Sequence, residues 1–212
     1  MSKPVVVIGA GGHAKVVVDA LLLLGAKVLC LTDADPAKHG ESVLGIPILG
    51  DDVMLSRYSP DEIHLALGIG SVKVSSVRRQ VFEKMRKSGY RFMTIVHPNT
   101  SIGREVELKE GCQIMAGAII QTGSVLGINV LVNTRASIDH DCRIGDHVHV
   151  GPGAILSGHV SLGSGCHVGC GATVIQERHL GNDVQIGAGA VVVNDSGDGS
   201  RILGVPGREI TR

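Results

Sequence analysis

The sequence predicts two structural units in succession, a small α/β domain and a parallel β-helix. The β-helix is predicted by a run from Val96 to Gly197 that divides, without a gap, into seventeen units of six residues, each beginning with Val, Ile or Leu. A short fixed period is typical of a solenoid, and a period of six indicates a parallel β-helix. Before this run an apolar strand pattern, a glycine-rich turn and an apolar helix follow one another. We therefore expect one domain over residues 1–95 and a second, with a short C-terminal tail, over residues 96–212.

The composition suits stacked layers of aliphatic side chains. Gly accounts for 30 of the 212 residues, Trp is absent and aromatic residues make up 2%. Lys plus Arg and Asp plus Glu number 20 each, so we expect neither nucleic acid nor an anionic membrane surface as a partner. Because the chain shows no long apolar run and no signal-like start, we expect a cytoplasmic protein with no membrane insertion.

In the first domain we expect parallel strands joined by helices. The predicted order is a strand over residues 4–9, a turn GAGGHA over 9–14, a helix to about residue 24, strands over 27–32 and 62–67, and a helix over 72–87. Strand, glycine-rich turn and helix form the Rossmann-like opening of a nucleotide-binding domain. A dinucleotide-binding fold contains two mononucleotide-binding halves. Fewer than a hundred residues precede the repeats, which is room for only one such half. We therefore expect a nucleoside diphosphate and not a dinucleotide such as NAD.

The carboxyl ends of these parallel strands should meet at one edge, where ligands bind in open sheets. There the glycine backbone and the N–H groups of the helix end would face phosphate, while Asp33 accepts hydrogen bonds from ribose or base. The alternative is that Gly11 and Gly12 only shape a tight turn, and His13 either caps the helix or touches the ligand. The predicted nucleotide-sugar-binding residues are Gly11, Gly12, His13, Asp33 and Gly68.

Within each repeat the second and fifth positions are also restricted. The fifth residue is small or apolar in every unit except the one that holds Arg178. We expect these fifth residues, among them Cys112, Cys142 and Cys166, to point into the coil. The second residue is Gly in eight units, which suits tight backbone bends.

His140 is the candidate catalytic residue. It is the third residue of the unit IDHDCR, in which Ile138 and Cys142 should point inward, so we expect its side chain to face outward. A neutral imidazole accepts a proton from an amine or hydroxyl, and a neighbouring carboxylate fixes its tautomer. We choose Asp141 over Asp139 as that partner. The alternative is a solvated surface histidine.

The stretch VNTRASIDHDC, from Val132 to Cys142, resembles the active-site stretch of the hexapeptide-repeat sugar acyltransferases. It is most similar to the bacillosamine-pathway UDP-4-amino-sugar N-acetyltransferases and the sialic-acid O-acetyltransferases. The resemblance extends over almost the whole chain, including the Gly-Gly-His turn and the closing GVPG at 204–207. It implies a left-handed β-helix with three units in each coil of about eighteen residues. It also implies a homotrimer with active sites between subunits.

The same resemblance implies roles for individual residues. His140 would be the general base, Asp141 would modulate it, and Asn133 would help to hold the amino sugar. Since Gly158 is eighteen residues after His140, its missing side chain should leave room for a pantetheine arm one coil away. His149 and His167, also eighteen apart, should stack. The residues implied to bind acetyl-CoA are His149, Gly158, Cys170 and Ala188.

The resemblance implies direct transfer from acetyl-CoA, with no metal and no acyl-enzyme, to the amino group, at C4, of a UDP-linked amino sugar for glycan synthesis. O-acetylation of a sialic acid or another sugar is the alternative within the enzyme class. A nucleotide-sensing binding module and a purely structural solenoid are the alternatives outside it. A zinc enzyme like the γ-class carbonic anhydrases, which place histidines on a β-helix, is disfavoured because a nucleotide-type domain has no purpose there.

Overall fold

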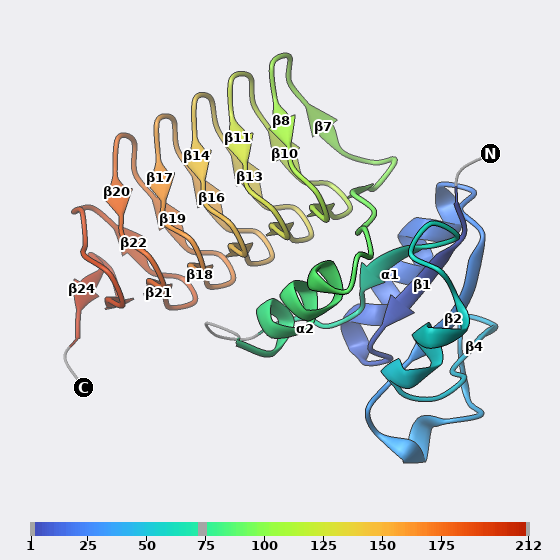
Figure 1. Cartoon of the computed structure of the whole chain (residues 1–212). Coiled ribbons are helices and arrows are strands. Elements are labelled where there is room, and N and C mark those ends of the chain that lie inside the picture. The colour runs from blue at the N-terminus through green and yellow to red at the C-terminus, as the bar shows by residue number, and fades with distance from the viewer. Residues whose placement is uncertain (1–2, 72–75, 211–212) are drawn as a thin grey trace. The chain divides into compact units, whose positions relative to one another are not determined.

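The computed structural model describes residues 3–71 and 76–210, in which the chain forms two compact units. The first unit comprises Met1–Gly70 with Ser76–Pro98, and the second comprises Ser71–Ser75 with Asn99–Arg212. The first unit holds the α/β elements, and the second holds the six-residue repeats (Figure 1).

The first unit is built on a parallel sheet of three strands in the order β2-β1-β5. The strands are β1 (Val5–Ile8), β2 (Val28–Thr32) and β5 (His64–Leu67), and α1 (Gly12–Leu23) connects β1 to β2. Val7 pairs with Leu31 on one side and with Ala66 on the other. The carboxyl ends of the three strands therefore lie at one edge, as the sequence predicts.

Apolar spacing explains how α1 packs. Ala14, Val17, Val18 and Leu21 are fully buried, and their i, i+3, i+4, i+7 spacing places them on one face of the helix. β1 is buried along its whole length, which is why it reads as the continuous apolar run VVVI.

Several short elements of the first unit have no clear sequence pattern. They are the 3-10 helices η1 (Pro36–Lys38) and η2 (Asp52–Arg57) and the antiparallel pair β3 (Ser42–Val43) and β4 (Ile46–Pro47). The last strand of the unit, β6 (Ile95–Val96), contains the first residue of the repeat run. The second helix, α2, spans Ser76–Lys87. Its predicted start at residue 72 lies outside the described residues.

The second unit consists of three parallel sheets, and successive strands along the chain belong to different sheets (Figure 1). The β13 sheet contains β7 (Ser101–Ile102), β10 (Ile119–Ile120), β13 (Ser137–Ile138), β16 (Ile155–Leu156), β19 (Thr173–Val174) and β22 (Val191–Val192). The β14 sheet contains β8 (Glu107–Leu108), β11 (Val125–Leu126), β14 (Arg143–Ile144), β17 (Ser161–Leu162) and β20 (His179–Leu180). The β15 sheet contains β9 (Gln113–Ile114), β12 (Leu131–Val132), β15 (His149–Val150), β18 (His167–Val168), β21 (Gln185–Ile186) and β23 (Arg201–Leu203), followed by β24 (Arg208–Glu209), which is antiparallel to β23.

The core of the second unit follows the repeat. Ser137 of β13 pairs with Ile119 and with Ile155, so neighbouring strands of a sheet are eighteen residues apart. From Ile114 to Val192 the first residue of every repeat is buried, whereas Ile102, near the start of the run, is exposed. Cys112, Cys142 and Cys166 are also buried, which confirms the inward direction predicted for the fifth position. Burial raises the pKa of Cys142 and of Cys166 to about 11.

The glycines at the second position have a different cause from the one we expected. A Cβ on Gly145 would lie 2.6 Å from the backbone N of Ser164, and a Cβ on Gly163 would lie 2.5 Å from the backbone C of Gly181. The close approach of the next coil therefore requires Gly there. The tight bends fall at the fourth position, where Asp141 has a φ of 58°.

Arg178, the exception at the fifth position, does not bury its charge. Its side chain is 28% exposed and lies 3.3 Å from the carboxylate of Asp195, while its Nε donates to the carbonyl of Gln176. The guanidinium is therefore paired at the surface of the coil.

Candidate functional site

Asp33 lies directly after β2 at the carboxyl edge of the first unit's sheet. Its carboxylate accepts hydrogen bonds from the backbone N–H of Ala10 at 2.7 Å, from that of Asp35 at 2.9 Å and from Nζ of Lys38 at 3.0 Å. Partial burial raises the pKa of Asp33, but the hydrogen bonds from Asp35, Lys38 and Ala10 outweigh it, and the pKa lies below its usual range. The edge therefore carries an ionised carboxylate beside a lysine.

The predicted glycines of this edge fall into two groups. A Cβ on Gly11 or on Gly12 would meet no described atom within 4 Å, and Gly11 caps α1 without a side-chain hydrogen bond. Packing therefore does not require Gly at either position, and the start of α1 is open to a ligand. A Cβ on Gly68 would lie 2.5 Å from the carbonyl of Gly9 and 2.7 Å from Cβ of Ala14. Gly68 is therefore needed for close packing, which we had not expected. His13 lies in the first turn of α1.

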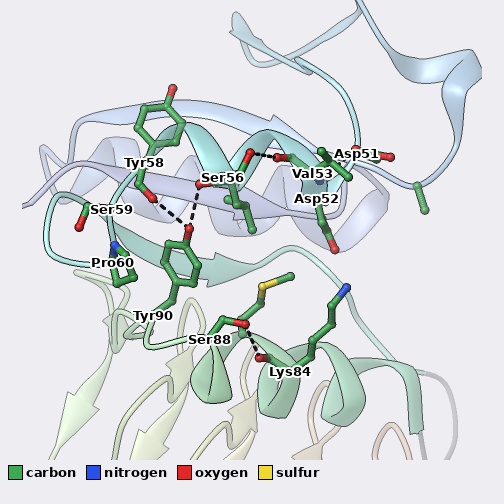
Figure 2. A pocket seen from close by; sticks show the side chains of 13 residues that line it. Asp51, Asp52, Val53, Ser56, Tyr58, Ser59, Pro60, Lys84, Ser88 and Tyr90 are labelled. Carbon is green, nitrogen blue, oxygen red and sulfur yellow. Dashed lines mark hydrogen bonds between the residues drawn. The ribbon is translucent and has the colours of Figure 1, made fainter.

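A hollow of about 920 Å³ lies elsewhere in the first unit, between η2 and α2 (Figure 2). Its polar groups are largely engaged by its own walls. The hydroxyl of Tyr90 bonds to the carbonyls of Leu55 and Tyr58, at 2.8 and 3.0 Å, and the carboxylate of Asp52 accepts from the hydroxyl of Thr32 at 2.7 Å. We therefore assign no ligand to this hollow.

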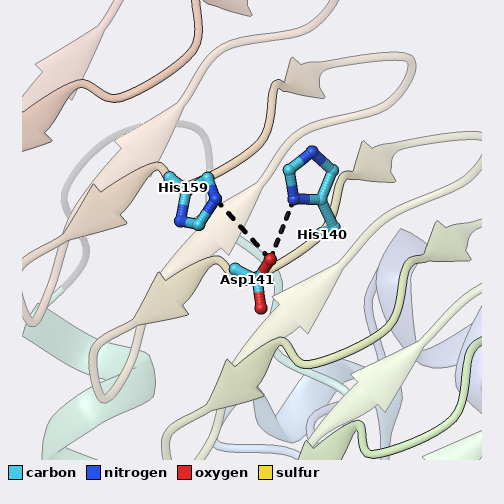
Figure 3. Close-up of side chains that lie close together, drawn as sticks. All are labelled: His140, Asp141 and His159. Carbon is cyan, nitrogen blue, oxygen red and sulfur yellow. Dashed lines mark hydrogen bonds and ion pairs between the residues drawn. The ribbon is translucent and has the colours of Figure 1, made fainter.

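In the second unit, His140 and Asp141 lie together at the corner that follows β13 (Figure 3). Nδ1 of His140 is 2.9 Å from Oδ2 of Asp141. Nε2 of His159 lies 3.6 Å from the same oxygen, and the two rings meet edge to face at 5.1 Å. The hydrogen bond with His140 lowers the pKa of Asp141, and His159 adds to this effect. The side chains of His140 and Asp141 are 41% and 44% exposed, so His140 faces outward as predicted.

Two glycines in the neighbouring coils bracket this pair. A Cβ on Gly158 would lie 2.5 Å from Nε2 of His140, and a Cβ on Gly123 would lie 2.5 Å from Oδ1 of Asp141. The space that we expected Gly158 to leave for a pantetheine arm is therefore taken by the His140 ring. The missing side chain of Gly158 therefore makes room for the His140 ring itself.

A pocket of about 360 Å³ lies over the β15 sheet. It brings together three of the four residues predicted to bind acetyl-CoA, His149, Cys170 and Ala188, and it also contains Asn133. Among the described residues, His140, Asp141 and Gly158 do not line it. Asn133 is thus placed with the predicted acetyl-CoA residues and not beside His140.

Hydrogen bonds fix His149 within this pocket. The backbone N–H of Thr134 donates to Oδ1 of Asn133 at 2.8 Å, so the amide turns Nδ2 towards Nε2 of His149, at 3.2 Å. Nε2 is therefore the acceptor of the ring, and Nδ1 donates to the hydroxyl of Ser71, at 2.7 Å. Both ring nitrogens of His149 are occupied.

Known proteins resemble this chain over its whole length. Residues 4–85 match the family described as the PglD N-terminal domain, and residues 123–158 and 141–176 match the bacterial transferase hexapeptide family (six repeats). Perosamine N-acetyltransferase from Caulobacter crescentus, solved with CoA and GDP-perosamine as a variant with one histidine replaced by asparagine, is 37% identical, with a TM-score of 0.90 over 100% of this chain and 99% of that chain. The chain belongs to the hexapeptide-repeat sugar acyltransferases.

Two further relatives of this acyltransferase are similar over most of their length. The acetyltransferase domain of PglB from Neisseria gonorrhoeae, solved with acetyl coenzyme A, is 36% identical, with a TM-score of 0.90 over 99% of this chain and 100% of that chain. A GDP-perosamine N-acetyltransferase from Escherichia coli O157:H7 is 28% identical over 160 residues, which are 73% of this chain and 70% of that protein.

The fold predicted for the acyltransferase is confirmed: a small α/β domain precedes the left-handed parallel β-helix of hexapeptide-repeat acetyltransferases. Within the part of the chain that the structure describes, neither helix has the length and apolar character needed to cross a bilayer.

Three residues that contact the predicted site residues of the acyltransferase were not predicted from the sequence. His159 follows Asp141 by eighteen residues, so the register alone could have placed them in adjacent coils. Lys38 reaches Asp33 through η1, which has no periodic signal. Ser71 meets His149 across 78 positions of the sequence, a contact that no local pattern predicts.

Proposed function

We propose that the chain transfers the acetyl group of acetyl-CoA directly to an amino group of a nucleoside-diphosphate-linked amino sugar. The contact between Nδ1 of His140 and Oδ2 of Asp141 carries this proposal. An ionised carboxylate only accepts hydrogen bonds, so Nδ1 holds the proton of the neutral ring and Nε2 presents a lone pair. A base with its free nitrogen on an outward face suits removal of a proton from an incoming amine.

The proposed steps need no covalent enzyme intermediate. The sugar amine attacks the thioester carbonyl carbon, and Nε2 of His140 takes the amine proton. The tetrahedral intermediate then collapses, the carbon–sulfur bond breaks, and CoA leaves as the thiolate. Asp141 stabilises the imidazolium that forms on His140.

For the acceptor, we propose an amine at C4 of the sugar. The resemblance of VNTRASIDHDC to the bacillosamine-pathway enzymes supports UDP as the nucleotide. The names of the perosamine enzymes from Caulobacter crescentus and Escherichia coli support GDP and an amine acceptor. In either case the start of α1 and the Asp33 carboxylate would receive the nucleotide.

We also propose that the active enzyme is a homotrimer with its sites between subunits. The support is that His140 lies at the corner after β13, while the pocket with His149, Cys170 and Ala188 lies over a different sheet of the same chain. An acyl donor held in that pocket would meet the base of a neighbouring copy.

A thiol-release assay tests the function. Acetyl-CoA is supplied with UDP-, GDP- or dTDP-linked 4-amino sugars or with free sialic acid, and CoA thiol is measured over time. We expect the wild-type protein to release thiol only with a UDP- or GDP-linked amino sugar. In His140→Ala we expect a large fall in kcat with a modest change in KM. Wild-type turnover by His140→Ala would exclude the base role. Nucleotide binding without thiol release from any acceptor would indicate a sensing module, and release with sialic acid alone would indicate O-acetylation.

A further inference from the structure

One buried histidine in the β15-sheet pocket has an unsatisfied nitrogen. His167 lies in β18 and is 7% exposed, and its Nδ1 has no hydrogen-bond partner among the described residues. Burial lowers the pKa of His167, so the ring is neutral near pH 7. Buried polar groups in native proteins are almost always paired, because an unpaired group costs stability.

The neighbouring histidine does not supply the missing partner. His149 pairs with His167 in register, and the rings meet edge to face at 4.9 Å. Both nitrogens of His149 are occupied by Ser71 and Asn133. The two histidines share the sixth position of the repeat, but only His167 has an unpaired ring nitrogen among the described residues. This Nδ1 is itself buried, so a turn of the ring brings it to a ligand in the pocket.

The pocket around His167 suits a slender chain with amide groups. Its walls include Gly151, Gly169 and Gly187, which present backbone and no side chain, together with Pro152 and Ile186. A hollow with apolar walls and few polar groups is the usual form of a small-molecule site. An amide group offers both a donor and an acceptor, so it satisfies either tautomer of a neutral imidazole.

We propose that His167 binds the acyl donor, with its ring nitrogen hydrogen-bonded to an amide of the pantetheine arm of acetyl-CoA. This inference rests on the proposed function and adds a residue to it. The His149 ring then forms part of the pocket wall and packs against His167, while His167 makes the polar contact with the ligand.

Calorimetric titration of His167→Phe tests the proposal. Phe keeps a ring against His149 and removes both nitrogens. Each protein is titrated with CoA and with adenosine 3′,5′-bisphosphate, which lacks the pantetheine arm. We expect the variant to bind CoA about tenfold more weakly, as for the loss of one buried hydrogen bond, and to bind the bisphosphate unchanged. His179→Phe is the matched control, because His179 has the same repeat position in a different sheet, and it should bind both ligands as the wild type does.

Wild-type affinity of His167→Phe for CoA would overturn the proposal, and so would an equal loss for CoA and for the bisphosphate. If the Phe variant does not fold, as judged by thermal unfolding, His167→Leu provides the same test. Failure of the wild-type protein to bind CoA would contradict the proposed function itself, and it is distinguishable from either result.

Discussion

His140 is flanked by two acids that do different work. Oδ2 of Asp141 faces the ring, whereas Oδ1 of Asp139 accepts from the backbone N–H of His140 at 2.8 Å. Asp139 thus fixes the start of the corner, and Asp141 sets the tautomer. Gly158 and Gly123 give the two side chains room in the coils on either side. The geometry of the His140 and Asp141 pair therefore depends on residues eighteen positions away.

Gly158→Ala should alter the position of the His140 ring without unfolding the β-helix. The new Cβ would lie 2.5 Å from Nε2 of His140, so the ring must turn away from its position. We expect kcat to fall by about tenfold or more, since a small misplacement of a catalytic group is costly, while circular dichroism shows an intact β-helix. Gly197→Ala is the control, because a Cβ there meets no described atom within 4 Å. Unchanged turnover in Gly158→Ala would show that the ring position is unimportant.

Asp33 should make a pH-dependent contribution to the stability of the first unit. Its folded-state pKa is lowered, so the contribution is present above the unfolded pKa of about 4 and is lost as pH falls through the folded pKa. We expect Asp33→Asn to lower the free energy of unfolding by about 1 to 2 kcal/mol at pH 7, through weakened charged hydrogen bonds. Urea unfolding at pH 7 and pH 3 measures this, and the difference between variant and wild type should shrink at pH 3. A constant difference would contradict the role of the carboxylate charge.

At the scale of an element, the start of α1 differs from other glycine-rich corners of the chain. In the β-helix, glycines such as Gly145 and Gly163 are required by the backbone of the next coil. At Gly11 and Gly12 no described atom stands where a side chain would be. A helix start without a side-chain cap has N–H groups available for an anion, so the element fits a phosphate site.

Gly12→Ala should therefore weaken nucleotide binding without a loss of stability. Ala is a better helix former than Gly by about 0.5 to 1 kcal/mol, so the melting temperature should stay constant or rise. Titration with UDP and GDP should show a lower affinity for whichever nucleotide the wild type binds, because the methyl group obstructs approach to the backbone. Gly68→Ala is the contrasting variant, and it should lower the melting temperature since its Cβ would lie 2.5 Å from the Gly9 carbonyl. Unaltered nucleotide affinity in Gly12→Ala would support a turn with no ligand.

At the scale of the whole molecule, the proposed trimer has a direct test. The chain has a mass of 22.0 kDa, and light scattering should give three times that value for the active protein. At a CoA concentration well below the Kd of the His167→Phe variant, a mixture of His140→Ala with His167→Phe should then show more activity than the sum of the two variants alone, because a mixed trimer pairs an unaltered His140 with an unaltered pocket. An active protein with the mass of a single chain would refute the shared site.

The repeat made most of the second unit predictable from sequence. Its register placed Cys142 inside and His140 outside, and the choice of Asp141 over Asp139 as the ring's neighbour is confirmed by the 2.9 Å contact. Contacts that depend on how distant segments meet, such as Ser71 with His149, were not predictable. Less of the first unit was predictable, because η1 and η2 lack a periodic pattern. The contact of Lys38 with Asp33 depends on η1.

The reversal of the chain at β24 bears on how the solenoid ends. A stack of parallel strands could in principle add further strands at its last edge, from another molecule as readily as from itself. β24 occupies that edge after β23, runs against the direction of the stack and is two residues long, Arg208–Glu209. A short, charged, reversed strand is a poor template for further pairing. We expect β24 to limit pairing with other molecules at this edge, and truncation before Arg208 to expose the edge of β23 to such pairing.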